Sequence, residues 1–180
     1  MSKKPLSKIS GLKSFKRPVF NSNLGIFSET YKKEWFKNKF VQDSISISEK
    51  KGTIRGMHFQ NGKFSQAKLI TVFKGAIQDV FIDLRKDSST FCHYGALKIS
   101  EDNNNVLLLP RGFAHGFVTL ESNTIVSYKM DNIYSPENEI TLRWDDPDIS
   151  ISWPKNLSYT LSSKDKDGIS LKEFLLINKF

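Results

Sequence analysis

Short runs of β-branched and aromatic residues recur about every ten residues from Ala67 onward, and this spacing constrains the fold more than any other feature. Turn-forming residues such as Lys74-Gly75 and Pro110-Arg111-Gly112 separate the runs. Strands at this spacing are typical of antiparallel sandwiches and barrels, whereas βαβ units need helices between strands. The runs that we predict to be strands are Lys68–Phe73, Ile77–Leu84, Phe91–Ile99, Val106–Leu109, His115–Leu120, Thr124–Met130 and Ile140–Trp144.

Helical patterns occur only towards the ends of the chain. Ser28 is placed to cap a short helix through Tyr31–Asn38, and Ser170–Phe180 carries apolar residues at roughly helical spacing. No repeat or linker interrupts the 180 residues between these ends. We therefore predict one all-β domain over residues 1–180, with a short helix towards each end.

The composition favours a protein of a reducing compartment. Cys92 is the single cysteine, so no internal disulfide can form. No stretch approaches the roughly 18 uninterrupted apolar residues of a membrane span. We expect a cytoplasmic protein without a membrane partner.

The formal net charge of +8 raises the question of nucleic-acid binding. From the first acidic residue, Glu29, onward, basic residues are interleaved with acidic ones, which favours a small phosphorylated anion over nucleic acid. Residues 1–14 hold lysines and serines but no acid, as a transit peptide would. Because they are rich in lysine rather than arginine and lead directly into patterned sequence, we interpret them as a flexible, solvated basic segment.

His58 lies in a predicted strand whose polar residues are unusual for a hydrophobic core. Strict alternation over Ile54–Gln60 would place Arg55, Met57 and Phe59 on one face and Ile54, Gly56, His58 and Gln60 on the other. An interior face with a histidine, a glutamine and a glycine is typical of a ligand cavity. Taken alone, His58 could equally be a core histidine with satisfied hydrogen bonds.

The other two histidines differ in their settings. His115 follows the turn Pro110-Arg111-Gly112 and is expected to open a strand at the barrel rim, where functional groups are common. His93 has no comparable context, and we assign it a structural role. A metal site is disfavoured, because the residue two places after His58 is Gln60 and no carboxylate occurs between Gln60 and Asp79.

Acid–base chemistry then needs other groups. Lys68 begins a predicted strand and can either extend to solvent or bind an anion inside a cavity. Tyr128 can fill core space or donate a proton in the pocket. Neither residue decides between these roles by itself.

Together, these segments resemble the dTDP-4-dehydrorhamnose 3,5-epimerase family of the cupin superfamily. The resemblance runs from about Phe15 to Asp165 and implies a cupin-type jelly-roll β-barrel. The segments that carry it are Ile54–Gln60, Gln66–Leu69, Asp79–Arg85, Ser89–Phe91, Pro110–Phe117, Tyr128-Lys129, Tyr134–Pro136, Trp144–Asp148, Trp153-Pro154 and Leu161–Asp165.

The resemblance implies a role for each member of an acid–base set. His58 corresponds to the catalytic base, Asp165 to the carboxylate that orients it, Lys68 to the enolate-stabilising lysine and Tyr128 to the proton donor. Substrate contacts correspond to Glu29, Gln42, Arg55, His115, Glu139 and Lys164. Such a set needs no cofactor, because the C4 ketone of the sugar already acidifies the hydrogens on C3 and C5.

The implied substrate is dTDP-4-dehydro-6-deoxy-D-glucose, inverted at C3 and C5 to dTDP-4-dehydro-L-rhamnose by a homodimer whose N-terminal strands extend the neighbour's sheet. The chain departs from the family pattern at Leu24-Gly25, Ser44 and Ile133, which alters the nucleotide and sugar edges of the site. Inversion at only one carbon, or of another nucleotide-linked 4-keto-deoxysugar, therefore remains an alternative. So does a non-catalytic sugar-binding cupin or a ketoisomerase.

Overall fold

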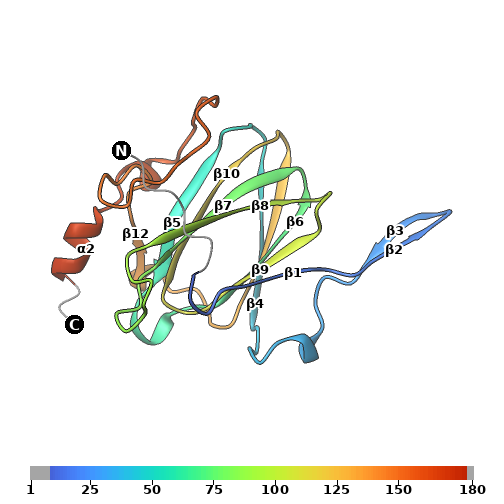
Figure 1. The fold of residues 1–180 in the computed structure, drawn as a ribbon, viewed down its shortest axis with the longest axis horizontal. Helices are drawn as coiled ribbons and strands as arrows, with labels where there is room; N and C mark the ends of the chain where they lie inside the picture. The colour runs from blue at the N-terminus through green and yellow to red at the C-terminus, as the bar shows by residue number, and fades with distance from the viewer. Residues whose placement is uncertain (1–8, 178–180) are drawn as a thin grey trace.

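The computed structural model describes residues 9–177. Two five-stranded antiparallel sheets face each other, in the strand orders β1-β9-β6-β11-β4 and β12-β5-β10-β7-β8 (Figure 1). This is an all-β jelly-roll architecture, and the predicted fold class is confirmed. The strands of the two sheets are β1 (Lys13–Lys16), β4 (Gln42–Ser48), β5 (Ile54–Gln60), β6 (Lys68–Lys74), β7 (Ala76–Asp83), β8 (Tyr94–Ser100), β9 (Asn105–Leu109), β10 (Phe113–Thr119), β11 (Thr124–Met130) and β12 (Glu139–Thr141).

The predicted strands are all present; two of them have one end shifted by three residues, and the ends of the others agree within two residues. β8 begins at Tyr94 rather than Phe91, because Cys92 has φ +58° and Ser89–Cys92 form a turn. His93 is exposed directly after that turn, and its Nδ1 lies 2.9 Å from the carbonyl oxygen of Phe91. β12 ends at Thr141, and Leu142 makes only an isolated bridge to Ile169.

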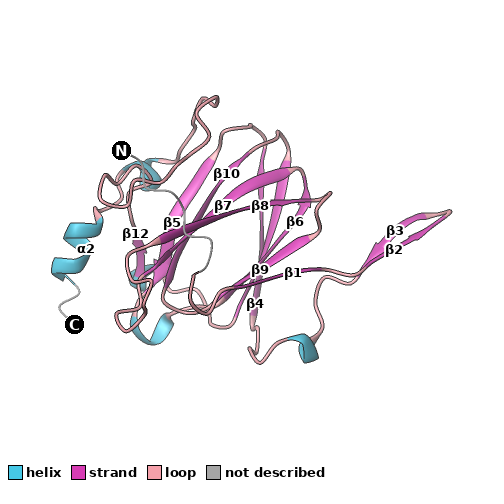
Figure 2. Cartoon of the chain, viewed as in Figure 1, coloured by secondary structure: helices cyan, strands magenta, loops and turns pink. Residues whose placement is uncertain are grey.

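Helices are few and short, and they lie at the periphery of the sandwich (Figure 2). They are α1 (Ser163–Lys166), α2 (Leu171–Ile177) and the single 3₁₀ turns η1 (Lys33–Trp35), η2 (Gly62–Phe64) and η3 (Pro136–Asn138). Within the described residues, no helix is long and apolar enough to cross a membrane.

The C-terminal helix is present where the sequence predicts it. Ser170 and Glu173 form a reciprocal cap at the start of α2, and residues 178–180 of the predicted helix lie outside the described residues. α1 was not predicted.

The N-terminal helix prediction over Tyr31–Asn38 is wrong except for the turn η1. Ser28 does not cap it, because Ser28 ends strand β3 (Gly25–Ser28) and its hydroxyl donates to the Pro18 carbonyl oxygen at 2.7 Å. The segment instead runs extended across the outer face of the first sheet. There the rings of Tyr31, Phe36 and Phe40 cover the buried side chains of Leu69, Val106 and Leu108.

Strand β2 (Val19–Ser22) pairs with β3 to form a hairpin that projects away from the sandwich (Figure 1). Among the described strands, β2 and β3 pair only with each other. The side chains of Phe20, Ile26 and Phe27 are more than half exposed on this hairpin. Its apolar surface therefore has no cover within the described chain.

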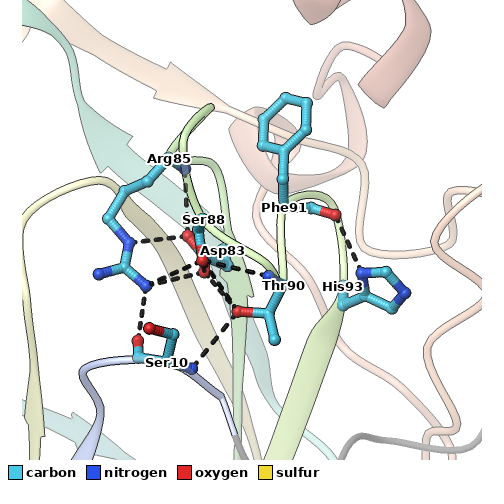
Figure 3. A network of polar contacts seen from close by, with 7 residues as sticks. All are labelled: Ser10, Asp83, Arg85, Ser88, Thr90, Phe91 and His93. Atoms are coloured by element: carbon cyan, nitrogen blue, oxygen red, sulfur yellow. Dashed lines mark hydrogen bonds and ion pairs between the residues drawn. The ribbon is translucent and has the colours of Figure 1, made fainter.

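A buried carboxylate anchors the start of the described chain (Figure 3). Asp83, fully buried at the end of β7, accepts hydrogen bonds from Arg85, Ser88 and Thr90. Arg85 also donates to the Ser10 carbonyl oxygen at 2.5 Å. Residues 1–8 of the segment predicted to be flexible lie outside the described residues, whereas Ile9 is buried in the core between the sheets.

Candidate functional site

A histidine–aspartate pair lies at the centre of the site. His58 sits on β5, and its Nε2 is 2.5 Å from Oδ1 of Asp165 in α1. Ser162 caps α1 and donates to the other oxygen of Asp165 at 2.8 Å. Burial alone would raise the pKa of Asp165, but the hydrogen bonds from His58 and Ser162 outweigh it and lower that pKa. Asp165 is therefore held as a carboxylate that can orient the imidazole ring.

A β-bulge in β5 decides which side chains share a face with His58. His58 pairs with His115 and Arg55 pairs with Phe117, so three steps along β5 match two along β10. The predicted strict alternation is therefore wrong: Arg55 and His58 line the same cavity, while Met57 is fully buried in the core. Gly56 has φ +118° at the bulge, where an added Cβ would lie 2.6 Å from the Gly116 Cα.

Lys68 reaches the site from the opposite sheet. It is the first residue of β6, and its Nζ lies 3.5 Å from the backbone oxygen of His58. Burial lowers the pKa of its ammonium group to about 8, partly opposed by the negative charges of Glu139 and Asp79. The side chain thus holds a positive charge inside the cavity rather than extending to solvent.

Tyr128 also comes from the first sheet, on β11. Its hydroxyl lies 2.9 Å from the Ser46 hydroxyl, and its ring packs edge-on to the His115 ring with centroids 6.2 Å apart. Burial raises the pKa of Tyr128, and the hydrogen bond with Ser46 opposes this shift. The phenol is therefore neutral at physiological pH, as a proton donor must be.

His115 differs from its predicted position at the rim. It lies inside β10, only 4% exposed, with its Nε2 2.7 Å from Oδ2 of Asp79 on β7. Burial raises the pKa of Asp79, although His115 and Lys68 oppose the shift. The sequence analysis did not single out Asp79 as a functional residue. The sequence does offer a sign of its role: Asp79 lies in the mostly apolar strand Ala76–Asp83, and a carboxylate in such a strand is rarely buried without a partner.

The cavity between the sheets has two adjoining parts, which share His58, Lys68 and Tyr128. The first part, of about 350 Å³, also contains Arg55, His115, Lys164 and Asp165. The second part, of about 360 Å³, also contains Gln42 and Glu139. The structure therefore brings together all but one of the residues predicted to form the site.

The rim of the second part is held by polar contacts. Glu139 accepts hydrogen bonds from Lys164 and from the Tyr134 hydroxyl. Burial would raise the pKa of Glu139, but these contacts outweigh it and lower that pKa. Gln42 accepts a hydrogen bond from the Tyr134 backbone at 2.8 Å.

Glu29 is the predicted site residue that does not join the others. It follows the β2–β3 hairpin and forms an ion pair with Lys32 at 2.7 Å. It lines neither part of the cavity that contains His58. In the described part of the chain, no three His, Cys, Asp or Glu side chains are grouped so that they could hold a metal ion.

The arrangement suits proton transfer at carbon. A histidine with a carboxylate partner faces the cavity from one sheet, and a neutral phenol and a lysine face it from the other. Such a site can remove a proton from one side of a bound molecule and return one from the other side, while the lysine stabilises the intermediate anion.

Known proteins with similar sequences and structures share one description. The profile of the dTDP-4-dehydrorhamnose 3,5-epimerase family matches residues 6–173. The dTDP-4-dehydrorhamnose 3,5-epimerase of Sinorhizobium fredii is 41% identical over 170 residues, which cover 92% of this chain and 87% of that protein.

Two solved structures extend the comparison. The dTDP-4-dehydrorhamnose 3,5-epimerase of Bacillus anthracis, with TDP and PPi bound, has a TM-score of 0.87 at 41% identity and covers 95% of this chain and 100% of that chain. The dTDP-6-deoxy-D-glucose-3,5-epimerase of Legionella pneumophila, in complex with dTDP-4-keto-L-rhamnose, has a TM-score of 0.87 at 31% identity, covering 96% of this chain and 94% of that one.

Proposed function

Because the chain belongs to the dTDP-4-dehydrorhamnose 3,5-epimerase family, we propose that it inverts C3 and C5 of dTDP-4-dehydro-6-deoxy-D-glucose, giving dTDP-4-dehydro-L-rhamnose. The observation that carries this proposal is the position of the acid–base groups. His58 with Asp165 faces the cavity from one sheet, and Tyr128 faces it from the other. Inversion needs two such groups on opposite sides of the sugar ring.

The reaction begins with removal of a proton next to the C4 ketone. Neutral His58 takes this proton, and Asp165 stabilises the resulting imidazolium through their 2.5 Å contact. The electron pair of the broken C–H bond moves to the ketone oxygen, which becomes an enolate. Lys68 is the cation that stabilises this oxygen, since its ammonium group lies in the same cavity.

Tyr128 completes the inversion. Its O–H bond breaks as a new C–H bond forms on the opposite face of the ring, and the negative charge passes to the phenolate oxygen. Solvent then returns a proton to Tyr128 and accepts the proton held by His58, which resets both groups before the second carbon reacts. The same two groups serve both carbons in turn, because both are adjacent to the ketone.

The polar residues of the cavity account for the rest of the substrate. Arg55 and His115 are suited to the diphosphate and sugar region. Gln42 and Glu139 contact the substrate from the second part of the cavity, and Lys164 contacts it from the first part. No step of the reaction needs a metal or a redox cofactor. A cytoplasmic location fits a chain with a single cysteine.

We also propose that the active form is a homodimer. β4 is the edge strand of its sheet, so its outer backbone groups have no strand partner among the described residues. The β2–β3 hairpin exposes apolar side chains and pairs with no other strand of the described residues. Pairing of one protomer's hairpin with the partner's β4 covers both surfaces and carries Glu29 towards the partner's cavity.

One experiment tests the function. Proton NMR of dTDP-4-keto-6-deoxyglucose with the protein in deuterated water should show deuterium at C3 and C5 and inversion of both carbons. Exchange and inversion at one carbon alone would instead identify a single-site epimerase. Movement of the carbonyl would identify a ketoisomerase, and absence of exchange would identify a non-catalytic binding protein.

A further inference from the structure

The inner face of β4 is lined with hydroxyl groups rather than apolar side chains. Along this strand exposure alternates strictly: Asp43, Ile45 and Ile47 are exposed, and the residues between them are turned inward. The inward residues are Gln42, Ser44, Ser46 and Ser48. Such a row is costly in a hydrophobic core unless its hydroxyl groups have hydrogen-bond partners.

Ser46 contacts the proposed proton donor. Its Oγ lies 2.9 Å from the Tyr128 hydroxyl, and both residues line the same cavity as His58. The Tyr128 ring is held by contacts with the rings of His115 and Phe117. Because β4 and β11 are paired neighbours, with Ser46 opposite Val126, the two hydroxyls are held together by the sheet itself.

We propose that Ser46 is a positioning residue for proton donation, acting through Tyr128. The inference rests on the proposed epimerase function. A serine hydroxyl rotates freely, so Ser46 can donate its hydrogen to the Tyr128 oxygen. The Tyr128 hydrogen then takes no part in the hydrogen bond with Ser46 and points towards the sugar, where it is needed.

The contact between Ser46 and Tyr128 becomes stronger after Tyr128 has donated its proton. Proton transfer from Tyr128 to the enolate carbon leaves a phenolate, whose charge is disfavoured by burial and by the nearby carboxylate of Asp79. Ser46 donates to that phenolate, and Arg55 favours it electrostatically. Hydrogen bonds to charged groups are stronger than those between neutral groups. Ser46 therefore stabilises the phenolate that proton donation leaves, and it takes no part in the removal of a proton by His58.

The test compares exchange with inversion in Ser46→Ala, Ser46→Thr and Ser127→Ala. Ser127 adjoins Tyr128 in the sequence but lies on the other face of β11, so it is a matched control. In Ser46→Ala, inversion should fall roughly tenfold to a hundredfold, as for loss of a hydrogen bond to a charged group, while deuterium exchange continues. Ser46→Thr keeps the hydroxyl and should restore inversion, and Ser127→Ala should leave both rates unchanged.

A purely structural role for Ser46 would give a different result. Exchange and inversion would fall together in Ser46→Ala, or neither would change, and either outcome would overturn the inference. Wild-type protein and Tyr128→Phe separate this failure from failure of the proposed function. If the wild type exchanges and Tyr128→Phe raises the exchange-to-inversion ratio, the function stands whatever Ser46→Ala does. If the wild type does not exchange, both proposals fall.

Discussion

His58 and Tyr128 act at different steps, so variants of the two should differ in how they affect deuterium exchange and inversion, and not only in rate. His58→Ala should abolish deuterium exchange at both carbons, because no enolate forms without the base. Tyr128→Phe should cripple inversion but still permit some exchange, because His58 can return the proton to the original face. Loss of a general base typically costs roughly a hundredfold to ten-thousandfold in rate. NMR in deuterated water measures both quantities.

Rate alone does not assign these roles, since Lys68→Ala removes an enolate-stabilising charge and should be comparably severe. The deciding quantity is the exchange-to-inversion ratio, which should rise in Tyr128→Phe. Normal exchange in His58→Ala together with no exchange in Tyr128→Phe would reverse the two roles.

The charge of Lys68 should give the reaction an upper pH limit. Burial lowers the pKa of this lysine to about 8, so the ammonium form is lost as pH rises through that value. If the enolate needs that charge, kcat/KM should decline above about pH 8, since this ratio reports the free enzyme. In Lys68→Arg the decline should be absent, because a guanidinium stays protonated in this range. A decline that persists unchanged in Lys68→Arg would contradict the assignment.

The hydrogen-bond network of Asp83, which holds the start of the described chain, can be tested by measuring the free energy of unfolding. Arg85→Ala leaves the buried Asp83 carboxylate without its cation, and removing one partner of a buried pair costs about 3 kcal/mol. We expect the lower end of the usual range for buried ion pairs, because the Arg85 side chain is 29% exposed. Urea titration should show this loss in the free energy of unfolding.

Arg143 provides the matched control, since it pairs with Asp145 at the same two-residue spacing. Both side chains of that pair are 44% exposed, so Arg143→Ala should leave the unfolding midpoint nearly unchanged. Equal midpoints for the Arg85 and Arg143 variants would mean that the Asp83 network does not anchor the N-terminal segment.

Individual elements were predictable to different degrees. The strands from β6 to β11 follow the sequence pattern because each buries a continuous apolar face. The helix expected at Tyr31–Asn38 does not form, because its aromatic residues cover an outer sheet surface that the sequence pattern does not reveal. The bulge in β5 was equally hidden, since it depends on pairing with β10.

For the whole molecule, a mixing experiment tests whether Glu29 acts on the partner's site. Glu29→Ala and His58→Ala homodimers should each have low activity. After subunit exchange, half of the dimers are mixed, and each mixed dimer has one site with both residues intact. About a quarter of wild-type activity should return if Glu29 acts across the interface. The proposal would be contradicted if no activity returned despite subunit exchange. It would also be contradicted if light scattering showed a monomer and that monomer were fully active.

Activity should also be independent of added metal. The described residues contain no group of ligands that could hold a metal ion, and the proposed steps use only side chains of the chain. Prolonged treatment with a chelator should therefore leave turnover unchanged. Loss of activity that one divalent ion restores would show that a metal takes part.

The all-β class followed from the strand pattern of the sequence, and the family resemblance predicted His58, Lys68, Tyr128 and Asp165 as an acid–base set. Both could be predicted from the sequence because strand periodicity is local and because the set lies in distinctive motifs. Which of these groups meet depends on strand register and packing. The bulge turned Arg55 and His58 to one face, strand pairing brought Asp79 to His115 and Ser46 to Tyr128, and the projecting hairpin left Glu29 outside the cavity. These contacts join residues far apart in the chain, and their formation depends on register and packing rather than on local sequence.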